Sequence, residues 1–238
     1  MRSFSQRAYD HIRGKLVQGW PAESELSEPI LARELGISRT PIREAIRQLE
    51  TEGLLEQRPR RGTFVRRPDR QELDEIYQVR LLLEPFAAGE AAQLLDAAAL
   101  AKIGESLAGM RDMIEQSRAA DRESQRDRLL QTHAFHDTAF HEGIVRAANN
   151  RRIVKIVADA NILALAMSFP KDSPRGALPS MERAFREHKR IFQALKRRDP
   201  QAARRAMTDH LTRVRASTLA YYDYVDRHAG LSHSMPSG

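Results

Sequence analysis

The sequence predicts a mainly α-helical protein, in which an N-terminal winged helix-turn-helix with a small β-wing precedes an all-α bundle of six helices. Three observations indicate this fold class. Two short helical patterns flank Gly36 between residues 28 and 47, and two short apolar segments flank the basic turn at 58–62. From residue 71 onward, apolar side chains recur at the spacing of one face of an α-helix.

The composition is that of a folded protein without a membrane segment. Of its 238 residues, 41% are hydrophobic and 30% are charged, which is sufficient for one or two domains with a core. No run approaches the roughly 18 uncharged apolar residues of a membrane span, and the N-terminus lacks the apolar stretch of a secretory signal. Cysteine is absent, so no disulfide or thiolate metal site is expected. We therefore expect a soluble, cytoplasmic protein with no membrane partner.

A first amphipathic helix is predicted over residues 5–18, and the sequence Gly19-Trp20-Pro21 ends it. Its inward face holds four apolar side chains, namely Ala8, Ile12, Leu16 and Val17. A helix with a single apolar face covers a core on that side only.

Residues 28–47 predict two short helices joined by a tight turn. Gly36 lies at the turn, where a positive φ costs glycine almost nothing. Ser27 and Ser38 are expected to cap the two helices, because a serine hydroxyl can accept a hydrogen bond from an orphan backbone N–H. The apolar faces that pack together are Ile30, Leu31 and Leu35 on the first helix, and Ile37, Ile42, Ala45 and Ile46 on the second.

The solvent side of the second helix carries Arg39, Thr40, Arg43 and Arg47. Guanidinium and hydroxyl groups near the start of a helix match a recognition helix for the DNA major groove. Residues 1–70 hold 14 Lys and Arg against 10 Asp and Glu, whereas the other 168 residues hold 25 against 22. The denser positive charge of the N-terminal part suits contact with DNA phosphates. The alternative is an ordinary helical hairpin with a solvated basic face.

A β-hairpin is predicted directly after the recognition helix. Gly53 ends that helix, Leu54 and Leu55 open a short strand, and residues 63–65 return as a second strand. The turn between them reads Arg58-Pro59-Arg60-Arg61-Gly62, a basic tip whose glycine permits close backbone approach. We expect this wing to contact the minor groove or the phosphates. The alternative is a turn that serves only solubility.

The remaining chain predicts almost continuous helix. Six helices are expected at 71–95, 97–118, a segment that ends at 149, 153–169, 180–198 and 200–228. The apolar stripe of the first comprises Leu73, Ile76, Val79, Leu83 and Phe86. The charged sequence DRESQRDR from Asp121 and the Pro- and Gly-containing sequence KDSPRGALPS are expected to be loops. The predicted domains are therefore 1–67 for DNA binding, a linker at 68–70, an all-α effector and dimerisation domain at 71–229, and a disordered tail at 230–238.

Four side chains of the bundle have the spacing of a metal site. Asp137 and His141 are four residues apart, so they share one face of a helix. His188 and His210 each lie eleven residues from Asp199, at the turn between the last two helices, which places both roughly 16 Å from that turn. One carboxylate and three imidazoles at one level suit a divalent ion such as Zn²⁺ or Ni²⁺. Histidines that only satisfy hydrogen bonds in the core are the alternative.

The sequence LARELGISRTPIREAIRQLETEGLLEQRPRRGTFV, from Leu31 to Val65, resembles the GntR family of bacterial transcription regulators. The resemblance implies DNA contacts from the start of the recognition helix and from the wing tip. With their neighbours on the same surfaces, the predicted DNA-binding residues are Ser38, Arg39, Thr40, Arg43, Arg47, Arg60, Arg61 and Gly62. The chain departs from many relatives in two places, because it lacks a Pro-Gly turn before Leu26 and has Pro29 where they have an arginine.

A winged helix followed by six helices resembles the FCD class of this family, whose C-terminal domain is an effector-binding bundle. This resemblance implies that Asp137, His141, His188 and His210 bind a divalent metal, and that the metal anchors a small carboxylate effector. Arg80 stands where relatives often have an arginine that can clamp a carboxylate. A plain i,i+4 ion pair with Glu84 is the equal alternative for Arg80. The class also implies a homodimer on a palindromic double-stranded DNA operator.

Two other functions are considered beside a metal-dependent, ligand-responsive regulator. The first is a regulator with a metal-free pocket for a larger acyl ligand. The second is a metal-dependent hydrolase or lyase, which is disfavoured because Glu142 directly follows His141 and therefore faces elsewhere on the helix. An enzyme would also leave the winged helix unexplained, so we expect a regulator, most simply a repressor, and no catalytic residues.

Overall fold

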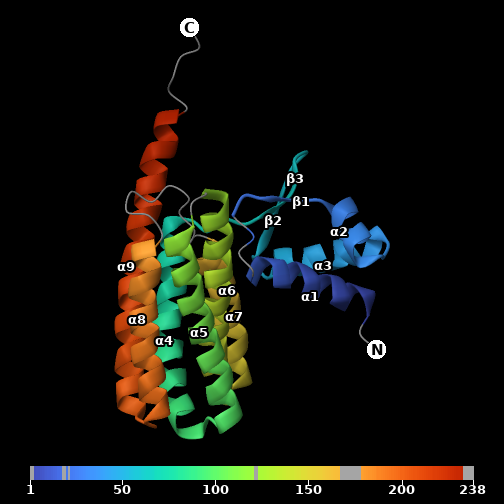
Figure 1. The fold of residues 1–238 in the computed structure, drawn as a ribbon. Coiled ribbons are helices and arrows are strands. Elements are labelled where there is room, and N and C mark those ends of the chain that lie inside the picture. The colour runs from blue at the N-terminus through green and yellow to red at the C-terminus, as the bar shows by residue number, and fades with distance from the viewer. Residues whose placement is uncertain (1–2, 18–19, 21, 121–122, 167–177, 233–238) are drawn as a thin grey trace.

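The computed structural model describes the chain except for residues 1–2, 18–19, 21, 121–122, 167–177 and 233–238 (Figure 1). Its N-terminal part consists of α1 (Phe4–Val17), β1 (Glu25–Leu26), α2 (Glu28–Leu35), α3 (Arg39–Thr51), β2 (Leu55–Arg58) and β3 (Gly62–Val65). Its C-terminal part consists of α4 (Arg70–Leu94), α5 (Ala97–Ala119), α6 (Glu123–Ala147), α7 (Arg151–Ala166), α8 (Leu178–Lys196) and α9 (Pro200–Ser232). The predicted fold class is confirmed, with the winged helix beside one end of a bundle of long helices.

The winged helix forms around apolar residues contributed by all three of its helices. Ala8 and Ile12 of α1, Leu31 of α2 and Ile42 and Ile46 of α3 are buried together. Gly36 has φ +63°, the left-handed conformation that the turn requires, as predicted. The hairpin β2–β3 is also confirmed, and the short strand β1, which was not predicted, pairs with β3 so that the sheet order is β1-β3-β2.

Two local predictions for this domain were wrong. Ile30 is 53% exposed, because Leu31 and Leu35 already turn the inner face of α2 toward the core. Ser27 and Ser38 occupy the N-cap positions, but neither hydroxyl accepts a cap hydrogen bond. Ser38 therefore leaves its hydroxyl on the exposed side, at the start of α3.

The bundle packs α4 along α9 and α5 along α6, with α8 against both pairs. Small residues on the second half of α4, such as Ala88, Ala91 and Ala92, share a core cluster with Met207 and Leu211 of α9. The large buried side chains include Met110 of α5, Phe140 and Ile144 of α6 and Ile191 of α8. Short side chains on α4 let the long α9 approach it closely.

The predicted apolar stripe of α4 was wrong at two of its five positions. Val79 and Phe86 are 36% and 42% exposed, although Leu73 and Ile76 are buried as expected. The inner positions are taken instead by Arg80 and Glu84, which form an ion pair inside the bundle. Periodicity could not find this, because a pattern of apolar residues takes no account of charged groups that neutralise each other.

Several predicted boundaries also change. The segment from Glu123 is part of α6, so most of the expected loop DRESQRDR is helical, since these residues form helix as readily as they form loop. Helix α8 begins at Leu178, inside the second predicted loop, whereas residues 171–177, the predicted end of the preceding helix near 169 and the tail from residue 233 lie outside the described residues. Helix α9 continues to Ser232, so residues 230–232 of the predicted tail are helical.

The winged helix and the bundle share one apolar cluster. It contains Leu73 and Tyr77 of α4, Leu163 of α7 and Tyr222 of α9 together with the core of the winged helix. The segment between the two parts is held on α9, because Arg67 lies 3.0 Å from Asp226. Within the described residues, no helix is long and apolar enough to cross a membrane.

Candidate functional site

The outer face of α3 carries the predicted recognition residues. Its inner face is anchored by Ile42, Ala45, Ile46 and Leu49, which are buried, so the opposite face must point to solvent. The exposed side chains are Ser38, Arg39, Thr40, Arg43 and Arg47. Five polar or cationic groups on one helix face can reach base edges and phosphates.

Arg43 is held at the surface by a carboxylate of the neighbouring helix. Its Nε lies 2.9 Å from Oε2 of Glu28, and the Arg43 side chain is more than half exposed. Such a surface ion pair contributes little free energy. The guanidinium can therefore exchange Glu28 for a base or a phosphate at small cost.

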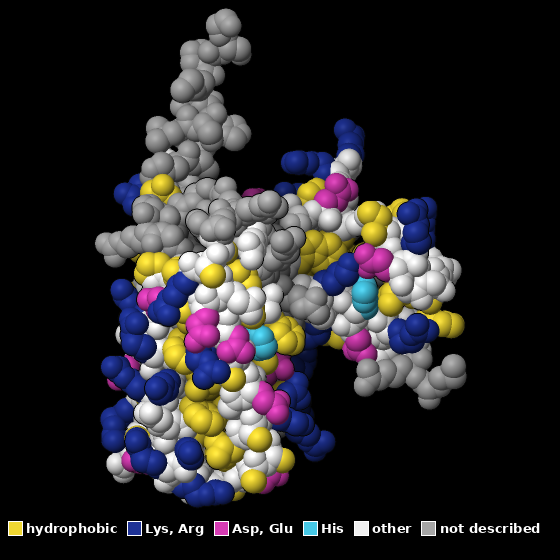
Figure 2. All heavy atoms as spheres, in the orientation of Figure 1, with side chains coloured by type: hydrophobic (Ala, Val, Ile, Leu, Met, Phe, Trp, Pro, Cys, Tyr) yellow, Lys and Arg dark blue, Asp and Glu magenta, His cyan; other side chains and the backbone are white. Residues whose placement is uncertain are grey.

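The wing presents Arg60, Arg61 and Gly62 to solvent. Figure 2 shows Lys and Arg side chains gathered at the tip of this hairpin. Gly62 has φ +107°, a backbone conformation that strains any residue with a side chain, so glycine is favoured at the wing tip. Arg58, also in the predicted turn, is occupied by ion pairs with Glu56 and Glu23.

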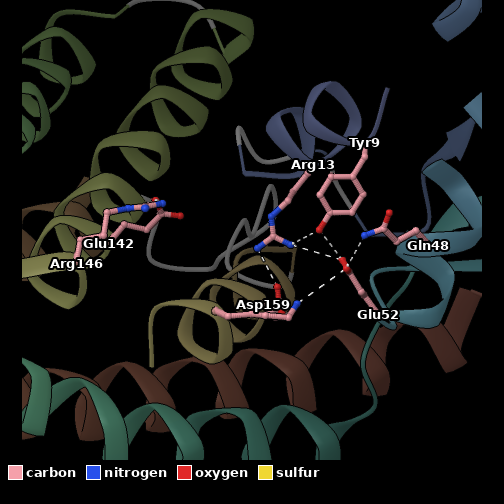
Figure 3. Close-up of polar contacts among 8 residues, drawn as sticks. Tyr9, Arg13, Gln48, Glu52, Glu142, Arg146 and Asp159 are labelled. Atoms are coloured by element: carbon pink, nitrogen blue, oxygen red, sulfur yellow. Dashed lines mark hydrogen bonds and ion pairs between the residues drawn. The ribbon is translucent and has the colours of Figure 1, made fainter. Parts of the chain in front are cut away.

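A polar network joins the winged helix to the bundle (Figure 3). Arg13 of α1 reaches across to α7, where its Nη2 lies 2.8 Å from Oδ1 of Asp159. At the end of α3, Glu52 accepts a hydrogen bond of 2.8 Å from Tyr9 and lies 4.0 Å from Nζ of Lys155 on α7. Burial and the bond to Glu52 raise the pKa of Tyr9 to about 12, so this hydroxyl keeps its proton. The recognition helix is thus linked to the bundle at its C-terminal end.

In the same view, Glu142 pairs with Arg146 on α6 and lies apart from this network. Its carboxylate is therefore engaged on the helix surface, one position away from the face that His141 occupies. This agrees with the prediction that Glu142 faces away from the histidine.

Three of the predicted metal ligands meet in the middle of the bundle. His141 of α6, His188 of α8 and His210 of α9 are buried, and each offers one ring nitrogen within 4.8 Å of the others. The Nε2 atoms of His141 and His188 are 3.1 Å apart. Asp137, one turn before His141, places its Oδ1 3.4 Å from Nε2 of His188. All four predicted residues are therefore neighbours, although Asp137 is partly exposed.

The donor set fits a divalent ion. Two nitrogens bound at about 2.0–2.1 Å to one tetrahedral zinc ion are roughly 3.3 Å apart, close to the observed separation of His141 and His188. Burial, reinforced by neighbouring imidazoles, lowers the pKa of His210 to about 3 and the pKa of His188 well below its ordinary value. Both rings are therefore neutral near pH 7, which is the form that binds metals.

Arg80 lies in the bundle as an ion pair with Glu84, its Nε 2.6 Å from Oε1. Burial alone would raise the pKa of Glu84, but the charge of Arg80 and the hydrogen bonds from Arg80 and His141 lower it to about 2, so the carboxylate is ionised. The i,i+4 alternative is thus present in the structure. This ion pair uses Nε of Arg80, which is one of the three nitrogens of its guanidinium.

Two carboxylates beside the histidines were not predicted from the sequence. Oε2 of Glu84 lies 2.5 Å from Nδ1 of His141, and Oε2 of Glu187 lies 2.9 Å from Nδ1 of His210. Glu84 was considered only as a partner for Arg80, and Glu187 precedes His188 without any local signal. His133, on the Asp137 face of α6, is buried, and its Nε2 has no partner among the described residues.

Comparison with known proteins agrees with this architecture. The family "Bacterial regulatory proteins, gntR family" matches residues 4–65, and the family "FCD domain" matches residues 75–213. The solved structure described as E. coli McbR/YncC has a TM-score of 0.73 at 20% identity and covers 93% of this chain and 100% of its own. A transcriptional regulator from Rhodococcus sp. RHA1 has a TM-score of 0.63 at 24% identity, with 91% and 97% covered. These two likenesses show the fold.

Curated relatives agree in sequence as well. A probable D-xylose utilization operon transcriptional repressor from Paenarthrobacter nicotinovorans is 32% identical over 85% of this chain and 83% of its own. The HTH-type transcriptional repressor RspR from Escherichia coli (strain K12) is 28% identical over 90% of this chain and 88% of its own. The chain therefore belongs to the GntR family of bacterial regulatory proteins, as a DNA-binding transcription regulator with an FCD domain and not an enzyme.

Proposed function

We propose that this chain is a ligand-responsive repressor that binds an operator through α3 and the wing and senses a small organic acid in its bundle. One observation supports it above the others. An outward-facing basic helix and a buried cluster of three imidazoles are parts of one chain whose two halves share an apolar core. Two relatives that are named transcriptional repressors support the same proposal. In this proposal residues 1–67 read DNA and residues 71–229 bind the effector.

The metal would be held by His141, His188 and His210, with Asp137 as a fourth ligand. The ion, a divalent cation such as Zn²⁺ or Ni²⁺, supplies a positive charge that attracts an anionic effector. Neutral imidazoles favour its binding, and Asp137 offsets part of its charge. The metal-free alternative, a larger acyl ligand, finds little support in a bundle centre filled by imidazoles and ion pairs.

Arg80 is proposed to serve the effector as well as the ion pair. Its Nε is committed to Glu84, and its guanidinium is close enough to Asp137 and His188 to interact with both electrostatically. The two terminal nitrogens can bind a carboxylate that approaches the metal from the Asp137 side. A buried guanidinium beside a cation is a site for an anion rather than for a neutral molecule.

We also propose a homodimer. Helix α4 exposes Val79, Leu82 and Phe86 at helical spacing, so one of its faces is apolar and solvent-exposed. A second copy is the natural cover for such a face, because a two-fold dimer presents two recognition helices to a palindromic operator. Selection of binding sites from a random duplex DNA library tests this directly. Inverted repeats are expected, and recovery of single half-sites would contradict a dimeric reader.

The network of Figure 3 is proposed to couple the bundle to the recognition helix, since Arg13 and Glu52 both contact α7. Arg13→Gln should accelerate amide hydrogen exchange in α1 and at the end of α3 about five-fold, because a partly buried ion pair in a network contributes roughly 1 kcal/mol. Exchange in α8 should stay unchanged.

Arg111→Gln is the control for this experiment, because Arg111 makes an exposed ion pair with Asp112 on α5, away from the winged helix. It should leave exchange in α1 at the wild-type rate. If Arg13→Gln also leaves α1 unchanged, the network does not hold the two parts together.

A further inference from the structure

His141 and Arg80 lie on opposite sides of the same buried carboxylate. Glu84 is completely buried, its Oε1 accepts from Arg80 Nε at 2.6 Å, and its Oε2 lies 2.5 Å from Nδ1 of His141. The carboxylate is therefore shared between a guanidinium on its own helix and an imidazole on α6. No water is needed to satisfy either oxygen.

His210 has the same arrangement on the other side of the cluster. Its Nδ1 lies 2.9 Å from Oε2 of Glu187, and Arg213, one turn further along α9, donates Nε–H to Oε1 of Glu187. Glu187 belongs to α8, so this second Arg–Glu–His chain again joins two helices. It repeats the first with no sequence relation between the two.

An ionised carboxylate can only accept hydrogen bonds, so each of these contacts requires a proton on Nδ1. A neutral imidazole that carries its proton on Nδ1 has its lone pair on Nε2. For His141 that lone pair points at the cluster, because its Nε2 is the atom 3.1 Å from Nε2 of His188. The position of the carboxylate thus selects which nitrogen is free for a metal.

We propose that Glu84 and Glu187 are positioning residues that hold His141 and His210 as Nδ1–H tautomers and leave both Nε2 atoms free for the divalent cation. The inference rests on the proposed metal-binding function and deepens it. Arg80 and Arg213 hold the two carboxylates and balance their charge before any cation arrives. A hydrogen bond from Nδ1–H to a carboxylate also makes Nε2 a stronger donor to the metal.

His188 completes the arrangement by having no such partner. Its Nδ1 is buried and has no hydrogen-bond partner among the described residues. With Nε2 of His141 unprotonated, as this proposal has it, the 3.1 Å contact has His188 donating from its own Nε2. Metal binding at that nitrogen then requires the His188 proton to move to Nδ1. His188 is the ring that must change tautomer, whereas His141 and His210 already have Nε2 free for the metal.

Imidazole ¹⁵N–¹H correlation spectra of the full-length wild-type protein, first freed of metal with a chelator, test the tautomers. His141 and His210 should carry the proton on Nδ1 and His188 on Nε2. After addition of one equivalent of Zn²⁺, only His188 should change. A proton on Nε2 of His141 or His210 in the metal-free protein would overturn the proposal, and this holds whether or not zinc binds.

Zinc affinity, measured by competition with a chromophoric chelator, tests the consequence. Glu84→Gln and Glu187→Gln should each weaken Zn²⁺ binding by roughly 10- to 100-fold. Matched controls are Glu90→Gln on α4, whose partner is Arg204, and Glu182→Gln on α8, whose partner is Arg118; neither pair touches the cluster. Both controls should keep the wild-type affinity within about two-fold.

The outcomes separate this inference from the proposed function. Wild-type affinity in Glu187→Gln, whose side chain is less buried than that of Glu84 and easier to replace without unfolding, contradicts a positioning role. A wild-type protein that binds no zinc contradicts the proposed metal site. In that case the NMR spectra still show whether Glu84 and Glu187 hold His141 and His210 as Nδ1–H tautomers.

Discussion

Replacement of both His188 and His210 by alanine is expected to abolish stoichiometric binding of a divalent metal. Of the three ring nitrogens that lie within 4.8 Å of one another, this change leaves only that of His141. A single imidazole with the partly exposed carboxylate of Asp137 makes a weak site, because zinc is normally held by three or four protein ligands. Metal content after equilibrium dialysis against Zn²⁺, measured by mass spectrometry, should fall from one equivalent per chain to background.

A control variant distinguishes loss of the metal site from the general effect of removing a histidine elsewhere in the protein. His11→Ala removes a partly exposed histidine of α1 that pairs with Glu34, outside the cluster, and it should keep the full equivalent. Thermal unfolding gives a second readout, because zinc at 100 times its dissociation constant stabilises the folded state by about 2.7 kcal/mol. That increment should be present in wild type and in His11→Ala and absent from the double variant. One retained equivalent of metal in the double variant would remove the basis for the site.

The elements that sequence analysis placed correctly are those specified by local chemistry. Gly36 was identifiable because only glycine adopts φ +63° without cost, and the wing followed from two short apolar segments around a basic turn. The strand β1 has two residues and depends on pairing with β3, so nothing within it predicts a strand. Ile30, Val79 and Phe86 were predicted to be buried but are exposed. The sequence does not distinguish an apolar residue at the edge of the buried face of a helix from one at its middle.

The candidate metal centre shows the same division. Asp137 and His141 share a helix face at a spacing of four, and His188 and His210 are equidistant from one turn, so helix geometry predicted each pair. That the two pairs meet was implied by the resemblance to the FCD class, and the four side chains are neighbours in the structure. The carboxylate of Glu84 reaches His141 from 57 residues away in the chain. Such a contact depends on how α4 and α6 are rotated against each other, which periodicity does not specify. That a metal binds there stays a prediction.

Arg43→Ala is expected to weaken specific operator binding by about 1–3 kcal/mol, or roughly 5- to 150-fold, with little change in the stability of the fold. The reason is geometric. Arg43 lies on the exposed face of α3, one turn after Arg39 and opposite the buried Ile42 and Ile46, so its loss removes no core contact. Gel-shift titration against a selected operator, with thermal unfolding in parallel, measures both quantities.

Two further variants separate base reading from general charge. Arg61→Ala at the wing tip should weaken binding to all sequences about equally and reduce the salt dependence by roughly one phosphate contact. Arg111→Ala removes an exposed arginine of α5 and should change nothing. Only Arg43→Ala is expected to lower the preference for the operator over random DNA, because a base contact carries sequence information and a phosphate contact does not. If Arg43→Ala binds the operator as tightly as wild type does, α3 reads DNA through other side chains or lies differently on the duplex.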